Sequence, residues 1–199
     1  MLLSLAHKFL FVANVKTASS SIEATLAPLA EIAIGETRFG KHEGLSVISQ
    51  RFSWVRRYVP YEDFFVFGMM RDPVDWLLSL YNSHTKADFD GLPYSTKDMP
   101  FSRFLHEGFG KRWQMRPQHL RFTDTHGRFR MSHIMDFNEL ENEFPQLCAR
   151  IGVECPDLRY KNKSPQAVSR DTLSADDINF IRDRYAADYE FFARRPRGL

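Results

Sequence analysis

Apolar and polar positions change pattern most clearly near the start of the chain. The apolar run 9–15 has the length of a strand, the polar turn 16–21 follows at once, and apolar positions then recur at helical spacing over 22–26. The same order returns where the apolar run 64–68 precedes a helical pattern that starts at Pro73. Two such units predict an α/β fold with a P-loop-like, doubly wound parallel sheet flanked by helices. Ligands of such folds bind beyond the carboxyl ends of the strands.

The rest of the chain continues this organisation, and no Gly/Ser-rich or Pro-rich linker divides it. A short third strand is expected at 131–135, a helix at 137–144 that restarts after Pro145, and a last helix after a capping-box-like start at Ser174. The segment 46–58 predicts a helix with four inward side chains, Val47, Ile48, Phe52 and Val55. Residues 1–199 are therefore predicted to form a single domain.

Residues 82–131 are predicted to be a substrate-side insertion. Periodicity is lost over 82–99, which we interpret as a loop over the site, and 101–131 interleaves many Arg and Lys residues with aromatic ones. Such a stretch suits single-stranded nucleic acid, or a sugar cleft in which rings stack on pyranoses and Arg pairs with an acidic group. A solvated helical face with ordinary core Phe residues is the third interpretation.

The turn after the first strand has the composition of an anion-binding loop. It contributes Lys16, Thr17, Ala18, Ser19, Ser20 and Ser21. The first amides of a helix have no partner within it and favour negative charge, hydroxyls add donors, and Lys16 adds a mobile cation. The Gly-rich Walker spacing is absent. Taken alone, the turn is equally compatible with an ordinary helix N-cap.

The second turn also ends a strand with groups that suit an anion. Arg71 lies at the predicted carboxyl end of this strand, Asp72 suits the N-cap of the following helix, and Ser79 follows about two turns into that helix.

Together these stretches resemble a known family, the sulfotransferases that use 3′-phosphoadenosine 5′-phosphosulfate (PAPS), particularly the carbohydrate and bacterial branch. Residues 16–21 resemble the family's 5′-phosphosulfate loop, and 71–81 resemble its 3′-phosphate segment. The resemblance includes the Gly-Lys-His motif at 40–42 and the chain ending at 188–192, and it covers most of the chain.

The resemblance implies roles for individual residues. Lys16 would neutralise the bridging oxygen of the leaving nucleotide, the amides of 17–21 would cradle the 5′-phosphate, and Arg71 with Ser79 would hold the 3′-phosphate. His42 would take the acceptor proton, a role that suits a pKa near neutrality. Lys163 and Ser164 would close over the nucleotide, although a plain charged linker explains them equally well. No metal is required.

Two positions depart from the family pattern. Ala18 stands where many relatives have Gly, which matters only if that residue needs a positive φ. Trp76 stands where relatives often place a second Arg.

Composition narrows the range of partners. The formal net charge of +2 on 199 residues is too small to indicate general nucleic-acid binding. Cys148 and Cys155 lack zinc-ligand neighbours and are expected to be free thiols. No segment is long enough to span a bilayer, and the start lacks the basic region of a signal peptide. These features predict no stable membrane insertion, and the family resemblance implies a bacterial, cytoplasmic enzyme that acts on a glycan or a small hydroxylated molecule.

Two other function classes stay open at this point. A small-molecule kinase would also use a strand, a phosphate loop and a helix, but it should show Walker spacing and an acidic magnesium ligand. A non-catalytic module would use 101–131 to bind nucleic acid and would ignore PAPS.

Overall fold

A computed structural model of the protein describes residues 1–35, 41–158 and 167–199. The chain divides into two compact units. The first unit comprises 1–71, 118–161 and 194–199, and the second comprises 72–117 and 162–193. The predicted insertion at 82–131 is thus shared between them. The single-domain organisation stays a prediction.

The first unit is built on a five-stranded sheet with the order β3-β1-β2-β4-β5. The strands are β1 (Leu2–Ser4), β2 (Phe9–Val12), β3 (Ile32–Ala33), β4 (Phe65–Met70) and β5 (His133–Asp136). β2, β4 and β5 are parallel to one another, whereas β1 pairs antiparallel with both β2 and β3. The expected parallel sheet is therefore correct for β2, β4 and β5 and wrong for β1 and β3.

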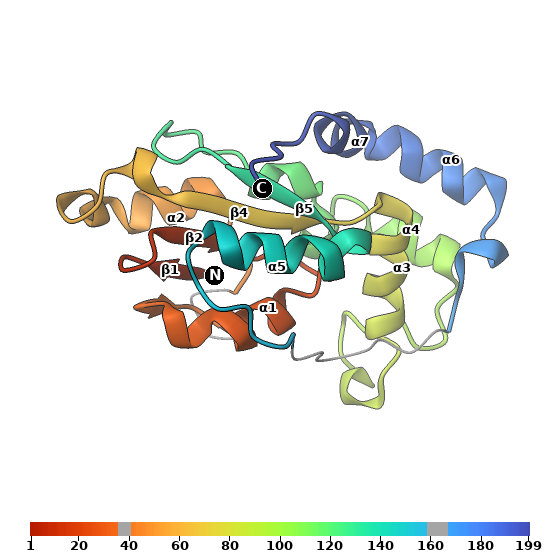
Figure 1. The fold of residues 1–199 in the computed structure, drawn as a ribbon. Coiled ribbons are helices and arrows are strands. Elements are labelled where there is room, and N and C mark those ends of the chain that lie inside the picture. The colour runs from red at the N-terminus through yellow and green to blue at the C-terminus, as the bar shows by residue number, and fades with distance from the viewer. Residues whose placement is uncertain (36–40, 159–166) are drawn as a thin grey trace. The chain divides into compact units, whose positions relative to one another are not determined.

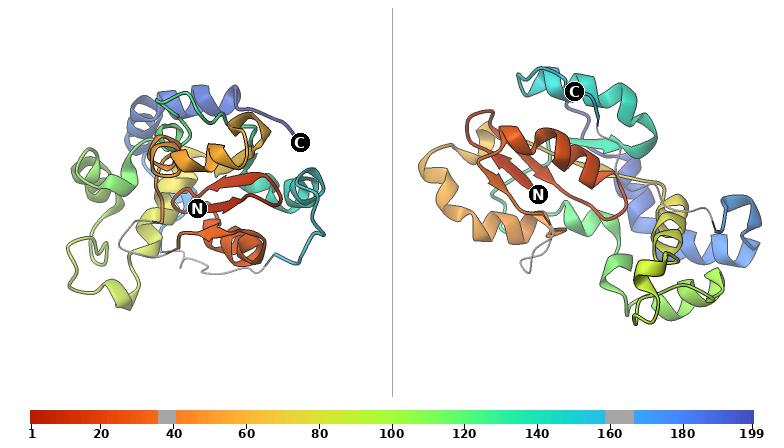
Figure 2. Two further views of the ribbon diagram at one scale, coloured as in Figure 1. Left: turned by 90° about the vertical axis from the view of Figure 1, so that its left-hand side faces the viewer. Right: turned by 90° about the horizontal axis from the view of Figure 1, so that it is seen from below.

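Helices cover both faces of this sheet, as the views in Figures 1 and 2 show. The helices of this unit are α1 (Ser19–Leu26), α2 (Leu45–Arg51) and α5 (Leu140–Arg150), with the short 3-10 helices η1 (Ala27–Leu29), η2 (Ser53–Arg57), η3 (Tyr61–Asp63), η6 (Gln118–Arg121) and η7 (Phe137–Glu139). α1 and α5 lie on one face, and α2 lies on the other.

Alternation along the strands explains this arrangement. Phe9 and Phe11 of β2, with Phe67 of β4, face the cluster that contains Ile22 of α1 and Phe144 of α5. The strand residues between them point to the opposite face, so the sheet is apolar on both sides, as parallel strands buried by helices require.

The second unit is helical. It contains α3 (Pro73–Ser83), α4 (Phe101–Gly108), α6 (Ala175–Arg184) and α7 (Ala186–Ala193), with η4 (Ala87–Phe89), η5 (Trp113–Met115) and η8 (Arg170–Thr172). Trp76 of α3 is fully buried and packs edge to face against Tyr185, with ring centroids 5.8 Å apart. The Tyr185 hydroxyl donates to the Met115 carbonyl at 2.7 Å. Trp76, one of the two departures from the family pattern, is thus a core residue of this unit.

Several predicted elements have different bounds in the structure. The helix expected at 46–58 ends at Arg51 and continues as η2, and Val47 is 43% exposed instead of inward. The two helices expected around Pro145 are one helix, α5, with Pro145 inside it. The predicted caps are confirmed: Asp72 accepts from the amides of Val74 and Asp75, and Ser174 accepts from that of Asp177. Within the described part of the chain, no helix combines the length and apolar character needed to cross a membrane.

Candidate functional site

The turn between β2 and α1 has a backbone suited to an anion. Lys16 has φ of 58° and Ala18, the N-cap of α1, has φ of 53°, so two residues of the turn adopt the left-handed conformation. Turns of this kind aim successive amides into a concavity that attracts anions, and the helix dipole adds to this at the N-terminus of α1. The Ala18 carbonyl accepts from the amides of Ser21 and Ile22, which starts the helix.

The hydroxyl side chains of the turn do not all face the same way. Thr17 is buried, and its Oγ1 donates to the Asn14 carbonyl at 3.2 Å, so this hydroxyl braces the turn. Ser20 is half-buried, and its Oγ accepts from Lys41 Nζ at 2.7 Å. Ser19 and Ser21 are buried.

Lys41 and His42 are brought to this turn from the next segment of the first unit. Lys41 Nζ also pairs with Glu23 Oε2 of α1 at 2.9 Å, which fixes Lys41 against the first helix. His42 Nδ1 lies 3.2 Å from the carbonyl oxygen of Ala13, between β2 and the turn. The family motif at 41–42 is thus in contact with both ends of the turn.

His42 has a defined tautomer because its partner can only accept. A carbonyl oxygen accepts hydrogen bonds, so Nδ1 carries the proton in the neutral ring and Nε2 has the lone pair. Burial lowers the pKa of His42 to about 3; the bond to Ala13 opposes this shift, and the charges of Arg121 and Lys41 add to it. The sequence led us to expect a pKa near neutrality, and in this structure the ring is instead a neutral acceptor throughout the physiological range.

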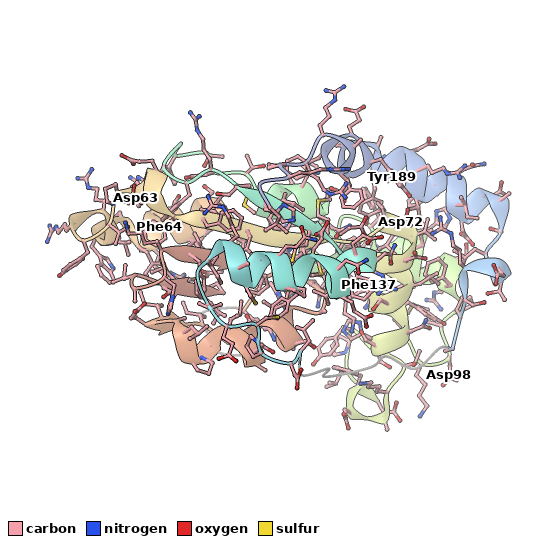
Figure 3. All side chains as sticks on the ribbon, viewed as in Figure 1. Asp63, Phe64, Asp72, Asp98, Phe137 and Tyr189 are labelled. Atoms are coloured by element: carbon pink, nitrogen blue, oxygen red, sulfur yellow. The ribbon has the colours of Figure 1, made fainter. Side chains whose placement is uncertain are left out.

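Arg71 follows β4, the parallel neighbour of β2, in which Val12 pairs with Gly68. Lys16 and Arg71 therefore follow adjacent strands at the same edge of the sheet. The Arg71 guanidinium carbon lies 4.2 Å from the ring centroid of Phe137, which begins η7 after β5 and is labelled in Figure 3. A cation–π contact of this kind holds the guanidinium plane without neutralising its charge.

A buried amide bridge joins the two strand ends. Asn14 and Gln118 are both fully buried, and Asn14 Nδ2 donates to Gln118 Oε1 at 2.9 Å and to the Met69 carbonyl at 3.3 Å. Gln118 also exchanges two hydrogen bonds with the Arg71 backbone: its Oε1 accepts from the Arg71 amide at 3.2 Å, and its Nε2 donates to the Arg71 carbonyl at 2.8 Å. The bridge fixes the backbone of Arg71 relative to the end of β2.

Sequence reasoning missed Asn14, Gln118, Arg121 and Phe137 as site residues. Arg121 is 9% exposed, and its Nη1 donates to the His42 carbonyl. Asn14 did leave a signal, since a polar amide directly before a turn interrupts an apolar strand. Gln118 lies 104 residues away in sequence, so no local pattern could have paired it with Asn14.

The roles of three predicted site residues stay untested. Ser79 belongs to α3 of the second unit and is half-buried; its role toward a 3′-phosphate stays a prediction. Near the start of α3, Arg170 pairs with Asp72 and Asp75 at 3.1 Å each, which anchors η8 to this helix. Lys163 and Ser164 lie outside the described residues.

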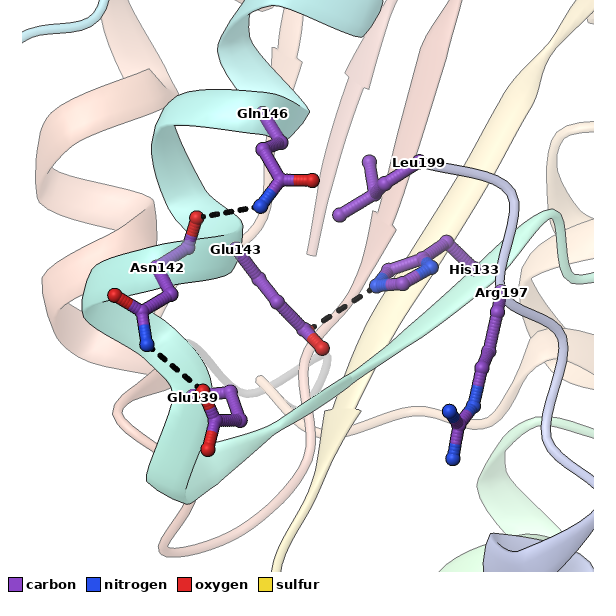
Figure 4. Close-up of a pocket in the computed structure, with 7 residues that line it drawn as sticks. All are labelled: His133, Glu139, Asn142, Glu143, Gln146, Arg197 and Leu199. Atoms are coloured by element: carbon purple, nitrogen blue, oxygen red, sulfur yellow. Dashed lines mark hydrogen bonds and ion pairs between the residues drawn. The ribbon is translucent and has the colours of Figure 1, made fainter.

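A hollow of about 290 Å³ beside β5 and α5 contains none of the predicted site residues (Figure 4). It is lined by His133, Glu139, Asn142, Glu143, Gln146, Arg197 and Leu199. His133 Nε2 lies 3.2 Å from Glu143 Oε2, which also accepts from the Asp136 amide at 3.1 Å. Two of its charged or polar side chains, His133 and Glu143, thus bind each other, and we assign the hollow no chemistry.

The fold is that of an α/β protein, and the turn after β2, at the carboxyl edge of its parallel strands, has a backbone suited to an anion. A model of the sulfotransferase family matches residues 2–193 of the 199, and the chain belongs to that family. No curated protein and no solved structure matched the chain in the same comparisons. Family membership makes the protein a transferase, with sulfuryl transfer as its general chemistry.

Proposed function

We propose that the protein transfers the sulfuryl group of PAPS to an acceptor hydroxyl, most fittingly on a carbohydrate. The observation that carries the proposal is the placement of Lys16 and Arg71 after adjacent parallel strands whose ends are joined by the Asn14–Gln118 bridge. PAPS has a 5′-phosphosulfate and a 3′-phosphate, and two cationic turns at one sheet edge suit these two anions.

The donor chemistry needs positioning and charge stabilisation. In the proposed step the acceptor oxygen forms a bond to sulfur, while the bond from sulfur to the bridging oxygen of the 5′-phosphate breaks. Lys16 and the amides of the turn would stabilise the negative charge that grows on that phosphate. Arg71, held over Phe137, would bind the 3′-phosphate and so distinguish PAPS from nucleotides that lack it.

The proton of the acceptor hydroxyl would pass to Nε2 of His42. A group with a pKa of about 3 is a weak base while the site is empty of donor. A bound anion beside the ring raises its pKa, because negative charge favours the protonated form. We therefore propose that donor binding itself makes His42 competent to accept the proton.

The second unit contains groups that suit a sugar acceptor. Tyr94 is 39% exposed and Trp113 is 51% exposed, and Arg112 Nη1 donates to the Tyr94 carbonyl at 2.9 Å. Exposed aromatic faces stack on pyranose rings, and this supports a carbohydrate acceptor over a purely anionic metabolite. A metal-free reaction, the absence of nucleic-acid partners and a bacterial cytoplasmic location stay predictions from the sequence.

The proposal is tested by nucleotide stabilisation followed by transfer. We expect 3′-phosphoadenosine 5′-phosphate (PAP) to raise the melting temperature more than ADP or ATP with Mg²⁺ does, because only PAP has both phosphates. Labelled PAPS should then transfer label to a hydroxylated glycan. Preference for ATP with Mg²⁺ would favour a kinase, and no nucleotide effect together with nucleic-acid binding would favour a non-catalytic module.

A further inference from the structure

Large exposed apolar side chains gather on one short stretch of the first unit. Val47 is 43% exposed, Trp54 43% and Tyr58 70%. Val47 belongs to α2, Trp54 to η2, and Tyr58 directly follows η2, whereas Ile48 and Val55 of the same stretch are fully buried. The rings of Trp54 and Tyr58 meet edge to face with centroids 6.0 Å apart. These three side chains face solvent, although their residue types are typical of a contact.

A loop carrying further arginines is fixed beside this stretch by Asp124. Asp124 accepts from Ser49 Oγ of α2 at 2.9 Å and from three amides of its own loop, those of His126, Arg128 and Phe129. Burial alone would raise the pKa of Asp124, but these amides and Ser49 lower it below its ordinary value. Asp124 is thus a charged anchor for the loop.

The anchored loop brings its arginines close to those of η2. Phe129 packs on Tyr61 with ring centroids 4.5 Å apart, and the Tyr61 hydroxyl donates to the Ser53 carbonyl at the start of η2 at 3.0 Å. Arg128 Nη1 donates to the Ser49 carbonyl at 3.1 Å. Four exposed arginines therefore lie on neighbouring segments of the first unit, Arg56, Arg57, Arg128 and Arg130.

We propose that this basic aromatic surface, made of Val47, Trp54, Tyr58, Arg56, Arg57, Arg128 and Arg130, binds an acidic polysaccharide. Arg56, Arg57 and Arg130 form no ion pair with any residue that the structure describes. Guanidinium forks pair with planar carboxylates and with sulfates in two-point contacts, and the neighbouring Trp and Tyr offer faces for sugar rings. The cations are all Arg, which favours such contacts over a diffuse attraction.

A membrane surface fits these residues less well. An interfacial helix buries a broad aliphatic face in the lipid boundary. Here Leu45, Ile48, Phe52 and Val55 are buried in the protein core. Only one exposed aliphatic side chain, Val47, therefore accompanies the exposed rings of Trp54 and Tyr58 on the stretch 45–58.

The part of the surface on η2 lies at the other end of β4 from Arg71. η2 and η3 precede β4, while Arg71 follows it, and β4 has six residues; a strand of this length spans about 17 Å. In Figure 3, Asp63 and Phe64 mark the start of β4, and Phe137 lies toward the opposite end of the sheet. Resting on the proposed function, the surface would tether a polymeric acceptor and raise its effective concentration at the reacting edge.

Binding is tested with the full chain and three probes: polygalacturonate, uncharged dextran, and vesicles of phosphatidylserine and phosphatidylcholine. We expect polygalacturonate to bind with an affinity that falls as salt rises, and dextran and vesicles to bind at least tenfold more weakly. R56E/R57E should weaken polygalacturonate binding at least tenfold, and W54A/Y58A should weaken it severalfold without a change of charge.

The matched control is R182E/R194E, which makes the same charge change at exposed positions outside the surface. It should keep most of the binding, and all three variants should keep the stabilisation by PAP. Equal losses in R182E/R194E and R56E/R57E would overturn the proposal, as would vesicle binding that depends on the surface residues. Intact PAP stabilisation without glycan binding would refute this surface alone, whereas surface-dependent glycan binding without a PAP effect would refute the proposed function alone.

Discussion

The carbonyl oxygen of Ala13 decides which ring nitrogen of His42 carries the proton. Since Nδ1 donates to it, only Nε2 is free to act on an acceptor. The substitution His42→Asn keeps a donor near the position of Nδ1 and removes Nε2. We expect H42N to fold and bind PAP normally, while the transfer rate falls by about a hundred- to ten-thousand-fold.

The companion variant is His42→Ala, which loses the bond to Ala13 as well. Thermal melts and PAP titrations separate the loss of the Nε2 base from the loss of the bond to Ala13, because only H42A should lose stability. Near-normal turnover in H42N would exclude His42 as the base.

The depressed pKa of His42 also predicts a dependence of folding on pH. The unfolded chain protonates this histidine near its ordinary pKa of 6.5, whereas the folded protein does so at about 3. Between these values the unfolded state binds more protons, so stability falls as pH is lowered from 6.5 toward 3, by up to about 1.4 kcal/mol per pH unit. Urea melts at several pH values should show that stability depends more steeply on pH in wild type than in H42N. Equal pH dependence in the two proteins would contradict the assignment.

NMR titration of the His42 ring should give a higher pKa with PAP bound than without it.

Ala18 occupies a backbone conformation that favours glycine. Its φ of 53° places the Cβ against the backbone, at a cost of about 1–2 kcal/mol. We expect Ala18→Gly to raise the free energy of unfolding by about 0.5–1 kcal/mol. The substitution relieves the backbone strain, and the greater freedom of glycine in the unfolded chain offsets part of this gain. Chemical denaturation measures this, with Ala24→Gly inside α1 as the control that should lose about 1 kcal/mol. Loss of stability in both variants would contradict the left-handed geometry.

At this scale the sequence predicts site residues whose neighbours in the chain share their chemistry. Lys16, His42 and Arg71 were predicted because each lies in a motif beside a strand end or loop. The low pKa of His42 was not predictable, since its burial and the proximity of Arg121 depend on segments far apart in sequence. The sequence showed that a positive φ at position 18 would matter, but it did not predict that Ala18 has one.

The connection between β2 and β4 depends on one amide side chain from η6. Gln118→Met keeps the volume but leaves the Asn14 amide and the backbone of Arg71 without this partner. A buried polar group without a partner costs about 1–3 kcal/mol. We expect Q118M to lose stability by that amount and to lose affinity for PAP more than for 5′-AMP, since Arg71 is displaced from the 3′-phosphate.

The control for this bridge is Gln146→Met on α5, where the exposed amide donates only to a backbone carbonyl. Q146M should change neither the stability nor the affinity for PAP by a measurable amount. An equal loss of affinity for PAP and 5′-AMP in Q118M would mean that the bridge is structural and does not position Arg71.

Helices and strands with strong hydrophobic periodicity or clear capping residues were predictable from the sequence, whereas the short strands were not. β1 was missed because the turn that joins it to β2 contains no Gly, Pro or Asn, and Lys8 takes its left-handed position with φ of 49°. The antiparallel edge of the sheet therefore gave no signal. Pro145 was taken as a break, but α5 continues through it to Arg150.

For the whole molecule, the small net charge of +2 conceals an uneven distribution of charge. One group of cations lies at the carboxyl edge of the parallel strands, and another forms the basic aromatic surface at the amino end of β4. Neither the division into two units nor this separation of charges was visible in the sequence, because both depend on long-range contacts.

The central claim is that the turns after β2 and β4 bind one nucleotide with phosphates at both the 3′ and 5′ positions. Calorimetric titration of wild type, Lys16→Ala and Arg71→Ala with PAP and 5′-AMP tests it most directly. We predict that K16A weakens both ligands at least tenfold, whereas R71A removes the preference for PAP and leaves 5′-AMP binding nearly unchanged. A PAP preference that survives in R71A, or wild-type protein that binds PAP no better than 5′-AMP, would contradict the account.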